Sequence, residues 1–339
     1  MTDAPDRPGF LRRLGIAGSN VLTPLHTALI ATYTAIRWLG AGDWWLVDAL
    51  GYILPWLFVP SLVLLPVALF RRRRAWRLLA LVPPVLFCLT YGHLFLPRLP
   101  IETAGPEFSV LTHNVYYRNE DVDGVAAAID AHAPDLFVLQ ELEPEMAAAL
   151  DNRFASRYPT HRVEPGCGLW SRHPILEYAA YQLVPGEGDW VQQAVVEIDG
   201  RRITVLNVHP RSPPIQGIHP LGLPLAIPTG FVTAGRDGDV QGLLSRIARI
   251  DGPLIVAGDF NLTDQQSQYR VLTQHLHDAH RESSWGLGFT FTYSPPGSPP
   301  LWRIDYAFHS SHLVALSTAR GGYGGSDHRP VIARFAFAE

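Results

Sequence analysis

The chain reads Leu254-Ile255-Val256-Ala257-Gly258-Asp259-Phe260-Asn261, an apolar run that ends in an acid and an amide. The apolar part, 254–258, has the length and composition of a buried β-strand. Catalytic side chains are often found where such a strand ends, because the rigid scaffold holds them in place. The segment therefore predicts a strand that displays Asp259 and Asn261 at its carboxyl end.

Similar apolar runs recur on both sides of this segment, separated by amphipathic stretches. Strands are predicted at 108–113, 136–140, 167–171, 193–198, 202–208, 254–258, 303–309 and 330–337. Helices are predicted at 122–132, 144–151, 238–250 and 267–275. Strands that alternate with helices in this way indicate a single α/β domain over 101–339.

Polar residues lie at or beside the ends of these runs in a set suited to phosphoryl transfer. The set consists of Asn114, Glu141, His209, Asp259, Asn261, Asp305, Asp327 and His328. Carboxylate and amide oxygens suit Mg²⁺ or Mn²⁺ better than zinc. Imidazoles and amides can stabilise the charge of a phosphorane transition state. No Cys or Ser stands in an elbow or triad pattern, so attack by an activated water is favoured.

These motifs, in this order, resemble the endonuclease/exonuclease/phosphatase superfamily, which includes deoxyribonuclease I, neutral sphingomyelinases and inositol polyphosphate 5-phosphatases. The resemblance covers about 108–337. It implies a four-layer sandwich of two central β-sheets flanked by helices. It also implies a metal site with Glu141 as the main ligand and with Asn114 and Asp327 beside it.

The resemblance also implies roles for the remaining residues. Asp259 would orient or deprotonate the attacking water, and Asn261 would hold a phosphate oxygen. His328 would stabilise the transition state or assist proton transfer, with Asp305 orienting its ring. His209 would bind the phosphate or help the leaving group.

Some motifs leave alternatives open. Asp305 could instead be a partner in a surface salt bridge. Gln140 and His113 fit structural roles, because His113 alternates away from Asn114 along a strand. A zinc site at His275, His277 and His280 is disfavoured, since the i, i+2 pair does not share a helix face.

The first hundred residues have a different composition. Apolar stretches at about 18–39, 46–70 and 78–96 are each near the ~20 residues that cross a bilayer, which predicts three transmembrane helices in a membrane domain, 1–100. The alternatives are a cleaved signal peptide and a buried helical domain. Two further spans follow the first, and the run Arg71-Arg72-Arg73-Arg74 between apolar stretches opposes burial.

The distribution of Arg predicts the orientation. Eight Arg, at 7, 12, 13, 71–74 and 77, fall on one side of the predicted spans, and Arg37 and Arg98 fall on the other. The positive-inside rule then places the N-terminus and the 71–77 loop in the cytoplasm. Three crossings predict a multi-pass protein of the cell membrane with an extracytoplasmic catalytic domain.

The segment 212–235 is an uncharged, Pro-rich stretch directly after His209. Long loops without secondary structure are usually functional or disordered. This one is expected to enter the bilayer or to cover an acyl or prenyl chain, or else to pack on its own domain. Separately, the architecture of three helices followed by an external domain of this type resembles the teicoplanin-resistance membrane proteins of the VanJ type, which suggests prenyl-pyrophosphate or other envelope-lipid chemistry.

The predicted function is hydrolysis of a phosphoester or pyrophosphate in a membrane-associated lipid, on the outer face. The alternative is a membrane-tethered nuclease. Residues 101–339 have a net charge of −10 and the chain has no Lys, which makes nucleic acid the less suitable partner. Arg118, Arg153, Arg157 and Arg162 could form a local patch that offsets this charge. A non-catalytic binding protein is disfavoured by the complete set of metal and phosphate residues.

Overall fold

The computed structural model describes residues 10–40, 44–71, 73–98, 103, 105–218, 227–293 and 298–338. The chain divides into two compact units, Met1–Phe95 and Leu96–Glu339.

The first unit is helical. Its elements are α1 (Phe10–Trp38), α2 (Trp45–Leu57), α3 (Ser61–Leu69), α4 (Arg74–Tyr91) and the 3₁₀ turn η1 (Gly92–Phe95). Helices α2 and α3 meet at an angle of 56°. The break lies at Pro60, which precedes the first residue of α3 and cannot donate a helical hydrogen bond.

The three predicted spans are only partly reproduced. Among the described residues, one helical stretch, Arg74–Phe95, is long and apolar enough to cross a membrane, with a mean hydropathy of 1.8. The bent pair α2 and α3 would be a second crossing if it forms one span. The predicted first span, 18–39, lies in α1, which is not among these candidates. Its threonines lower its hydropathy, and Thr27 and Thr34 donate to the carbonyls of Leu79 and Ile30.

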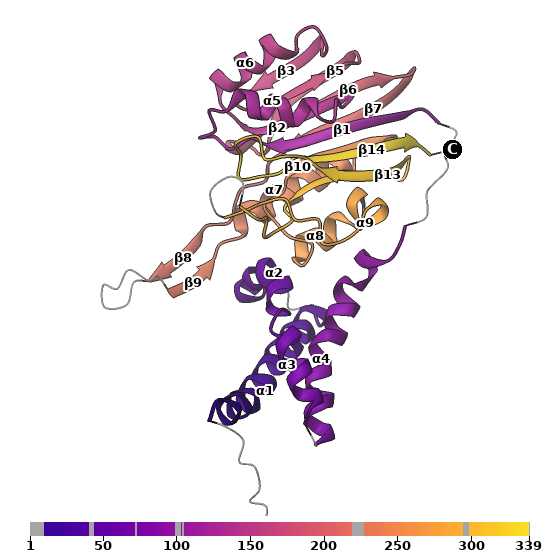
Figure 1. Ribbon diagram of the computed structural model, residues 1–339. Coiled ribbons are helices and arrows are strands. Elements are labelled where there is room, and N and C mark those ends of the chain that lie inside the picture. Colours follow the sequence, from indigo (N-terminus) through magenta and orange to yellow (C-terminus); the bar gives the residue numbers. More distant parts are fainter. Residues whose placement is uncertain are drawn as a thin grey trace, which may run out of the picture. The chain divides into compact units, whose positions relative to one another are not determined.

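The second unit contains two six-stranded sheets (Figure 1). The first sheet consists of β1 (Glu107–Asn114), β2 (Leu136–Leu142), β3 (Thr160–Glu164), β4 (Gly166–Ser171), β13 (Leu313–Arg320) and β14 (Val331–Phe337). The second consists of β5 (Ile175–Val184), β6 (Glu187–Ile198), β7 (Arg201–Val208), β10 (Leu254–Asp259), β11 (His277–Asp278) and β12 (Asp305–His309). The strand orders are β13-β14-β1-β2-β4-β3 and β11-β12-β10-β7-β6-β5.

Helices cover the outer faces of both sheets. They are α5 (Val122–Asp130), α6 (Pro144–Phe154), α7 (Ala234–Ile247) and α8 (Ser267–Leu272), whereas α9 (Ala279–Ser283) contacts β12 and β13 and places Ala279 in the core between the sheets. One apolar cluster joins the inner faces, with Val110 and Val138 from the first sheet and Val205 and Ile255 from the second. A second cluster joins the first sheet to α5 and α6, and a third joins the second sheet to α7 and α8. The predicted α/β sandwich of two sheets flanked by helices is confirmed.

The prediction that 212–235 lacks secondary structure was wrong. The antiparallel strands β8 (Ile215–Ile218) and β9 (Ile227–Phe231) form a separate hairpin, with Ile218 paired to Ile227, and α7 begins at Ala234. Figure 1 shows this hairpin extending away from the two sheets. Residues 219–226, including Leu221, Leu223 and Leu225, lie outside the described part of the chain.

Candidate active site

The polar residues predicted from the strand ends lie at one end of the seam between the two sheets. Asn114 ends β1 and Glu141 lies near the end of β2, and these strands are parallel. Asp259 ends β10, which runs parallel to β7, the strand that His209 follows. Parallel strands bring their carboxyl ends to the same edge. The fold therefore joins side chains that are distant in sequence.

Glu141, His209 and Asp259 each offer a ligand atom, and these atoms lie within 4.8 Å of one another. His209 Nε2 is 3.8 Å from Glu141 Oε1 and 3.5 Å from Asp259 Oδ2. The Asn114 amide donates to the same two oxygens, at 2.9 Å to Glu141 and 3.0 Å to Asp259. Its Oδ1 accepts from the Tyr116 N–H. Asn114 thus holds both carboxylates in position.

Asp327, the third predicted metal ligand, lies at the edge of this group. Its Oδ1 is 4.0 Å from His328 Nε2 and is buried without a hydrogen-bond partner among the residues that the structure describes. Burial raises the pKa of Asp327, and the negative charges of Glu141 and Asp259 raise it further. The carboxylates of Glu141, Asp259 and Asp327 are a donor set suited to a hard divalent cation, and the charge of such a cation would offset their mutual repulsion. The residues present therefore fit a divalent metal.

The backbone is strained where two of these side chains are displayed. Glu141 has φ of 52° and Asn261 has φ of 49°, a region that costs residues other than glycine about 1–3 kcal/mol. At Glu141 the pairing of β2 with β4 shifts between Gln140 and Leu142, which leaves Glu141 out of the ladder. Such strain persists where surrounding structure enforces it, and it often marks a functional site.

Gly258 permits the close approach of β10 and β7. Its φ is +157°, and a Cβ at this position would lie 1.8 Å from the carbonyl oxygen of Val208. β10 and β7 can therefore pair this closely only because residue 258 has no side chain. The close pairing brings Asp259 and His209 together.

His328 and Asp305 form a buried pair. His328 Nδ1 donates to Asp305 Oδ2 at 2.9 Å, and Nε2 lies 3.7 Å from Asp259 Oδ2. Burial lowers the pKa of His328, but the charges of Asp305 and Asp259 outweigh it and raise this pKa to about 9. His328 is therefore an imidazolium at neutral pH. Asp305 is buried, which does not fit the alternative of a surface salt bridge.

A second His–Asp pair was missed by the sequence analysis. His209 Nδ1 donates to Asp189 Oδ2 at 2.9 Å. Burial lowers the pKa of His209, but hydrogen bonds with Asp189 and Asp259 and the charges of both raise it well above its usual value. Asp189 lies early in β6, inside a strand whose apolar run was predicted to begin only at 193. No spacing to His209 in the sequence pointed to it.

Asn261 lies against His209. Its amide nitrogen is 3.2 Å from His209 Nε2 and donates to the Pro210 carbonyl at 3.1 Å. Its N–H donates to Asp259 Oδ1 at 2.9 Å, and its carbonyl accepts from the buried Arg236 at 3.3 Å. All eight predicted site residues thus lie in one neighbourhood.

Amide side chains under the site link the two sheets. Gln140 Nε2 donates to Asn207 Oδ1 at 2.6 Å, and Asn207 Nδ2 donates to the Leu139 carbonyl at 3.0 Å. His113 is fully buried and lies 3.2 Å from the His328 carbonyl. Gln140 and His113 are therefore structural, as expected. His275, His277 and His280 form no metal-binding group in the described part of the chain.

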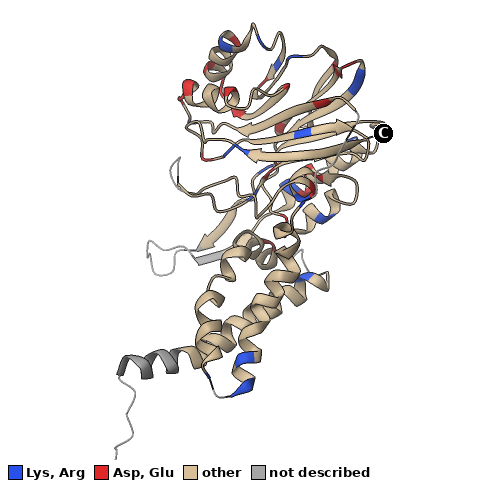
Figure 2. Ribbon diagram, turned by 45° about the vertical axis from the view of Figure 1, so that its right-hand side comes forward, with Lys and Arg blue, Asp and Glu red and all other residues tan. Residues whose placement is uncertain are grey.

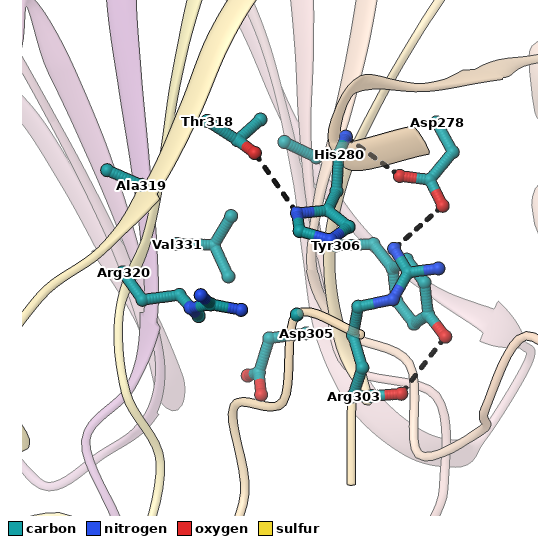
Figure 3. A pocket seen from close by; sticks show the side chains of 11 residues that line it. Asp278, His280, Arg303, Asp305, Tyr306, Thr318, Ala319, Arg320 and Val331 are labelled. Carbon is teal, nitrogen blue, oxygen red and sulfur yellow. Dashed lines mark hydrogen bonds and ion pairs between the residues drawn. The ribbon is translucent and has the colours of Figure 1, made fainter. Parts of the chain in front are cut away.

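A small cavity of about 10 Å³ lies behind Asp305, between β12 and β13. Figure 3 shows His280, Arg303 and Arg320 lining it, with Arg303 bound to Asp278 at 2.7 Å. This volume holds about one water molecule. Burial and the positive charge of Arg303 lower the pKa of His280 to about 4.

This depressed pKa predicts a loss of stability in acid. The unfolded chain binds a proton at His280 near pH 6.5, whereas the folded chain does so only near pH 4. The free energy of unfolding should therefore fall by about 2–3 kcal/mol from this group as the pH drops from 6.5 to 4.5. Urea denaturation of the detergent-solubilised chain at both pH values measures the drop, which should be smaller in His280→Gln. An equal drop in both proteins would show that His280 is not responsible.

Comparison with known proteins agrees with this geometry. The structure is similar to an endonuclease/exonuclease/phosphatase from Bacteroides vulgatus, with 17% identity and a TM-score of 0.56, over 69% of this chain and 100% of that one. It is also similar to D. rerio TDP2 complexed with a single-strand DNA product, with 18% identity and a TM-score of 0.54, over 68% of this chain and 98% of that one. A protein from Beutenbergia cavernae has 21% identity and a TM-score of 0.51, over 68% of this chain and 72% of that one.

These likenesses show the fold. No curated protein sequence matches the chain. The model of the Endonuclease/Exonuclease/phosphatase family, whose members depend on a divalent metal, matches residues 111–328. The match covers more than half of the chain, which is therefore a phosphoester hydrolase belonging to the Endonuclease/Exonuclease/phosphatase family.

Proposed function

We propose that this chain is a membrane-anchored phosphoesterase that uses Mg²⁺ or Mn²⁺. It would hydrolyse a phosphoester or pyrophosphate of a membrane-associated lipid on the outer face of the membrane. The observation that carries the hydrolytic part is the convergence of two acid and histidine groups on Asp259. One group joins Glu141 and His209 to Asp259, and the other joins Asp305 and His328 to it.

Each residue has a chemical task in this proposal. Glu141 and Asp327 would hold the metal, which when bound would polarise a phosphate oxygen and lower the pKa of water. Asp259 would accept a hydrogen bond from the attacking water and orient it. Asp305 fixes the His328 ring through Nδ1, which leaves Nε2–H free to donate to the charge that develops on phosphorus oxygens.

His209 would complete the arrangement on the opposite side. Its Nδ1 is held by Asp189, so Nε2 faces Glu141 and Asp259. A protonated ring there would donate to a phosphate oxygen or to the departing oxygen. Asn261 lies beside this nitrogen and would contribute its amide.

The membrane anchor is supported by the surface of the helical unit. Phe70 is 90% exposed and Leu62 is 74% exposed. Further exposed apolar side chains in this unit are Val21, Leu22, Leu25, Val63, Leu78 and Leu89. In the described part of this unit most of the helical ribbon is neutral, and the Arg residues of the helices lie near the end of α1 and the start of α4 (Figure 2). A unit with this much exposed apolar surface would be unstable in water, and a bilayer would cover it.

Fusion reporters test the orientation. The Arg distribution predicts that a reporter active only outside the cytoplasm works when fused after Glu339. The same reporter inserted in 71–77 should be silent. The reverse pattern would place the active site in the cytoplasm and exclude an outer-face substrate.

The β8–β9 hairpin offers a second test of lipid contact. Ile215 is 70% exposed on an uncharged hairpin a few residues after His209. Burial of one such side chain contributes roughly 1.5–3 kcal/mol. Ile215→Ser should therefore raise KM for a lipid substrate in vesicles about tenfold or more, and leave KM for a small soluble phosphodiester unchanged. Val163→Ser, an exposed apolar change on β3, serves as the control. Equal effects on both substrates would contradict a role in lipid contact.

A tethered nuclease is the second candidate, supported by the fold shared with a protein that was crystallised with single-strand DNA. Its weakness is electrostatic. Residues 101–339 have a net charge of −10, while nucleic-acid affinity depends on neutralising phosphates with Lys and Arg.

A product screen of the purified, detergent-solubilised chain decides between the candidates. Lipid pyrophosphates, phospholipids and single-stranded DNA are compared with Mg²⁺, with Mn²⁺ and with excess chelator. Metal-dependent release from a lipid supports the proposal. Cleavage of DNA with no release from any lipid would favour the nuclease.

A further inference from the structure

A cavity of about 360 Å³ lies between the segment that follows β1 and the start of α6. Its lining includes Tyr117, Arg118, Glu120, Glu143, Glu145 and Met146. The volume is within the range of ligand pockets. None of these residues takes part in the catalytic cluster described above.

The cavity is connected to Glu141, the carboxylate proposed to hold the metal, through its lining residue Tyr117. Glu141 Oε1 faces Asn114 and His209, while Oε2 accepts from the Tyr117 N–H at 3.1 Å. The two oxygens of one side chain thus face the catalytic cluster and the cavity rim. A substrate whose phosphate reaches the cluster would extend its next group toward this rim.

The rim of the cavity, formed by the segment 116–119 after β1, is held in a fixed shape. Asn119 donates to the carbonyls of Val115 and Gly324, at 3.0 Å and 2.9 Å. Tyr116 has φ of 65°, and its ring packs edge-on against Tyr117 at 5.2 Å. The Arg118 guanidinium lies over the Tyr117 ring, 5.0 Å from its centroid. A preformed rim lowers the entropy lost when a ligand binds.

The charges around the cavity select the kind of ligand. Among the described residues that line the cavity, three exposed carboxylates (Glu120, Glu143 and Glu145) face one positive charge, that of Arg118. This balance repels a further phosphate, such as the next one in a polynucleotide. It favours a group that donates hydrogen bonds or carries a positive charge, while Met146 provides a buried apolar floor.

We propose that this cavity is a substrate subsite that binds an amine- or hydroxyl-bearing head group esterified to the scissile phosphate. The inference rests on the proposed phosphoesterase function and specifies its substrate class. It predicts that the enzyme prefers phosphodiesters with a cationic or polyhydroxyl group over those with an anionic one.

Three matched esters test the preference: 2-aminoethyl, ethyl and carboxymethyl 4-nitrophenyl phosphate. They share the leaving group and differ only in the charge of the other substituent. KM should rise in that order, by about three- to tenfold per step at low ionic strength, and the steps should shrink as salt is added. Glu143→Gln/Glu145→Gln should reduce the preference, and Glu143→Arg/Glu145→Arg should invert it, with kcat for the ethyl ester unchanged. Glu177→Arg, an exposed change on β5, should alter none of these values.

A binding measurement separates this inference from the proposed function. Calorimetry of phosphoethanolamine with the wild-type chain should show binding that weakens about tenfold in Glu143→Gln/Glu145→Gln. Hydrolysis of all three esters with equal KM would overturn the subsite and leave the phosphoesterase intact. Charge-dependent binding without hydrolysis of any ester would support the subsite and contradict the phosphoesterase. A loss of kcat for the ethyl ester in the double variants would show that the rim only supports Glu141, which also overturns the subsite.

Discussion

Glu141→Gln should lower kcat by about a hundredfold or more. Both oxygens of Glu141 have defined positions, one among Asn114 and His209 and the other at the Tyr117 N–H. The amide has nearly the same shape and keeps one oxygen, so the fold should be retained. What it removes is the negative charge that would hold a divalent cation, and Asp259 is already engaged by Asn114 and His209. The several kcal/mol of charge stabilisation that a bound metal supplies should be lost.

Steady-state kinetics on a soluble phosphodiester, over a titration of Mg²⁺ and Mn²⁺, measure this effect. The wild-type enzyme should lose activity in excess chelator and regain it when either metal is restored. Glu177→Gln, which neutralises an exposed carboxylate on β5, should behave as wild type. Full activity in Glu141→Gln, or in wild type with chelator, would reject the metal-dependent mechanism.

His328→Asn should lower kcat by about 10²- to 10⁴-fold, the usual contribution of a positioned acid or base. The wild-type ring is positively charged at neutral pH, because the nearby carboxylates raise its pKa to about 9. Asparagine can still donate a hydrogen bond but cannot carry the charge. The transition state therefore loses an electrostatic partner, while binding of the ground state changes little. KM should accordingly stay within about threefold of wild type.

Asp305→Asn provides the matched comparison. It retains the His328 side chain but removes the carboxylate that fixes Nδ1 and favours the charged ring. The loss in kcat should be smaller than for His328→Asn, and the double variant should be no worse than His328→Asn alone, since the two residues act as a unit. Additive losses in the double variant would show that Asp305 acts independently of His328.

The sequence predicted the central strands of the sandwich and missed its edges. β3, β13, β5 and β11 are the outermost strands of the two sheets, and none of them was predicted. A central strand is covered on both faces and reads as a continuous apolar run, as at 254–258. An edge strand is partly exposed and mixes polar with apolar residues, as β5 does with Glu177 and Gln182 among apolar neighbours. Local hydrophobicity therefore could not reveal it.

The residues of the candidate site were also predicted only in part. Residues at the ends of central strands were predictable, because the apolar run in the sequence shows where such a strand ends. Asn114 and Asp259 are examples. Asp189 was not predictable, because it lies within a long strand. Its role is to hold His209, and only the pairing of β6 with β7 brings these two residues together. The proposed subsite was missed for a related reason: its walls come from the segment after β1 and from the start of α6, which sequence patterns do not place together.

The site draws its groups equally from both sheets. Asn114, Glu141 and His328 belong to the first sheet and the loop that leads into its last strand, whereas His209, Asp259 and Asp305 belong to the second. Neither half of the sandwich holds a complete set. A fragment, a circular permutant or a split protein would thus hydrolyse its substrate only when both sheets have closed on each other, and turnover itself would report that closure. Pieces of this domain could serve as a reconstitution sensor, because they would be silent apart and active once joined.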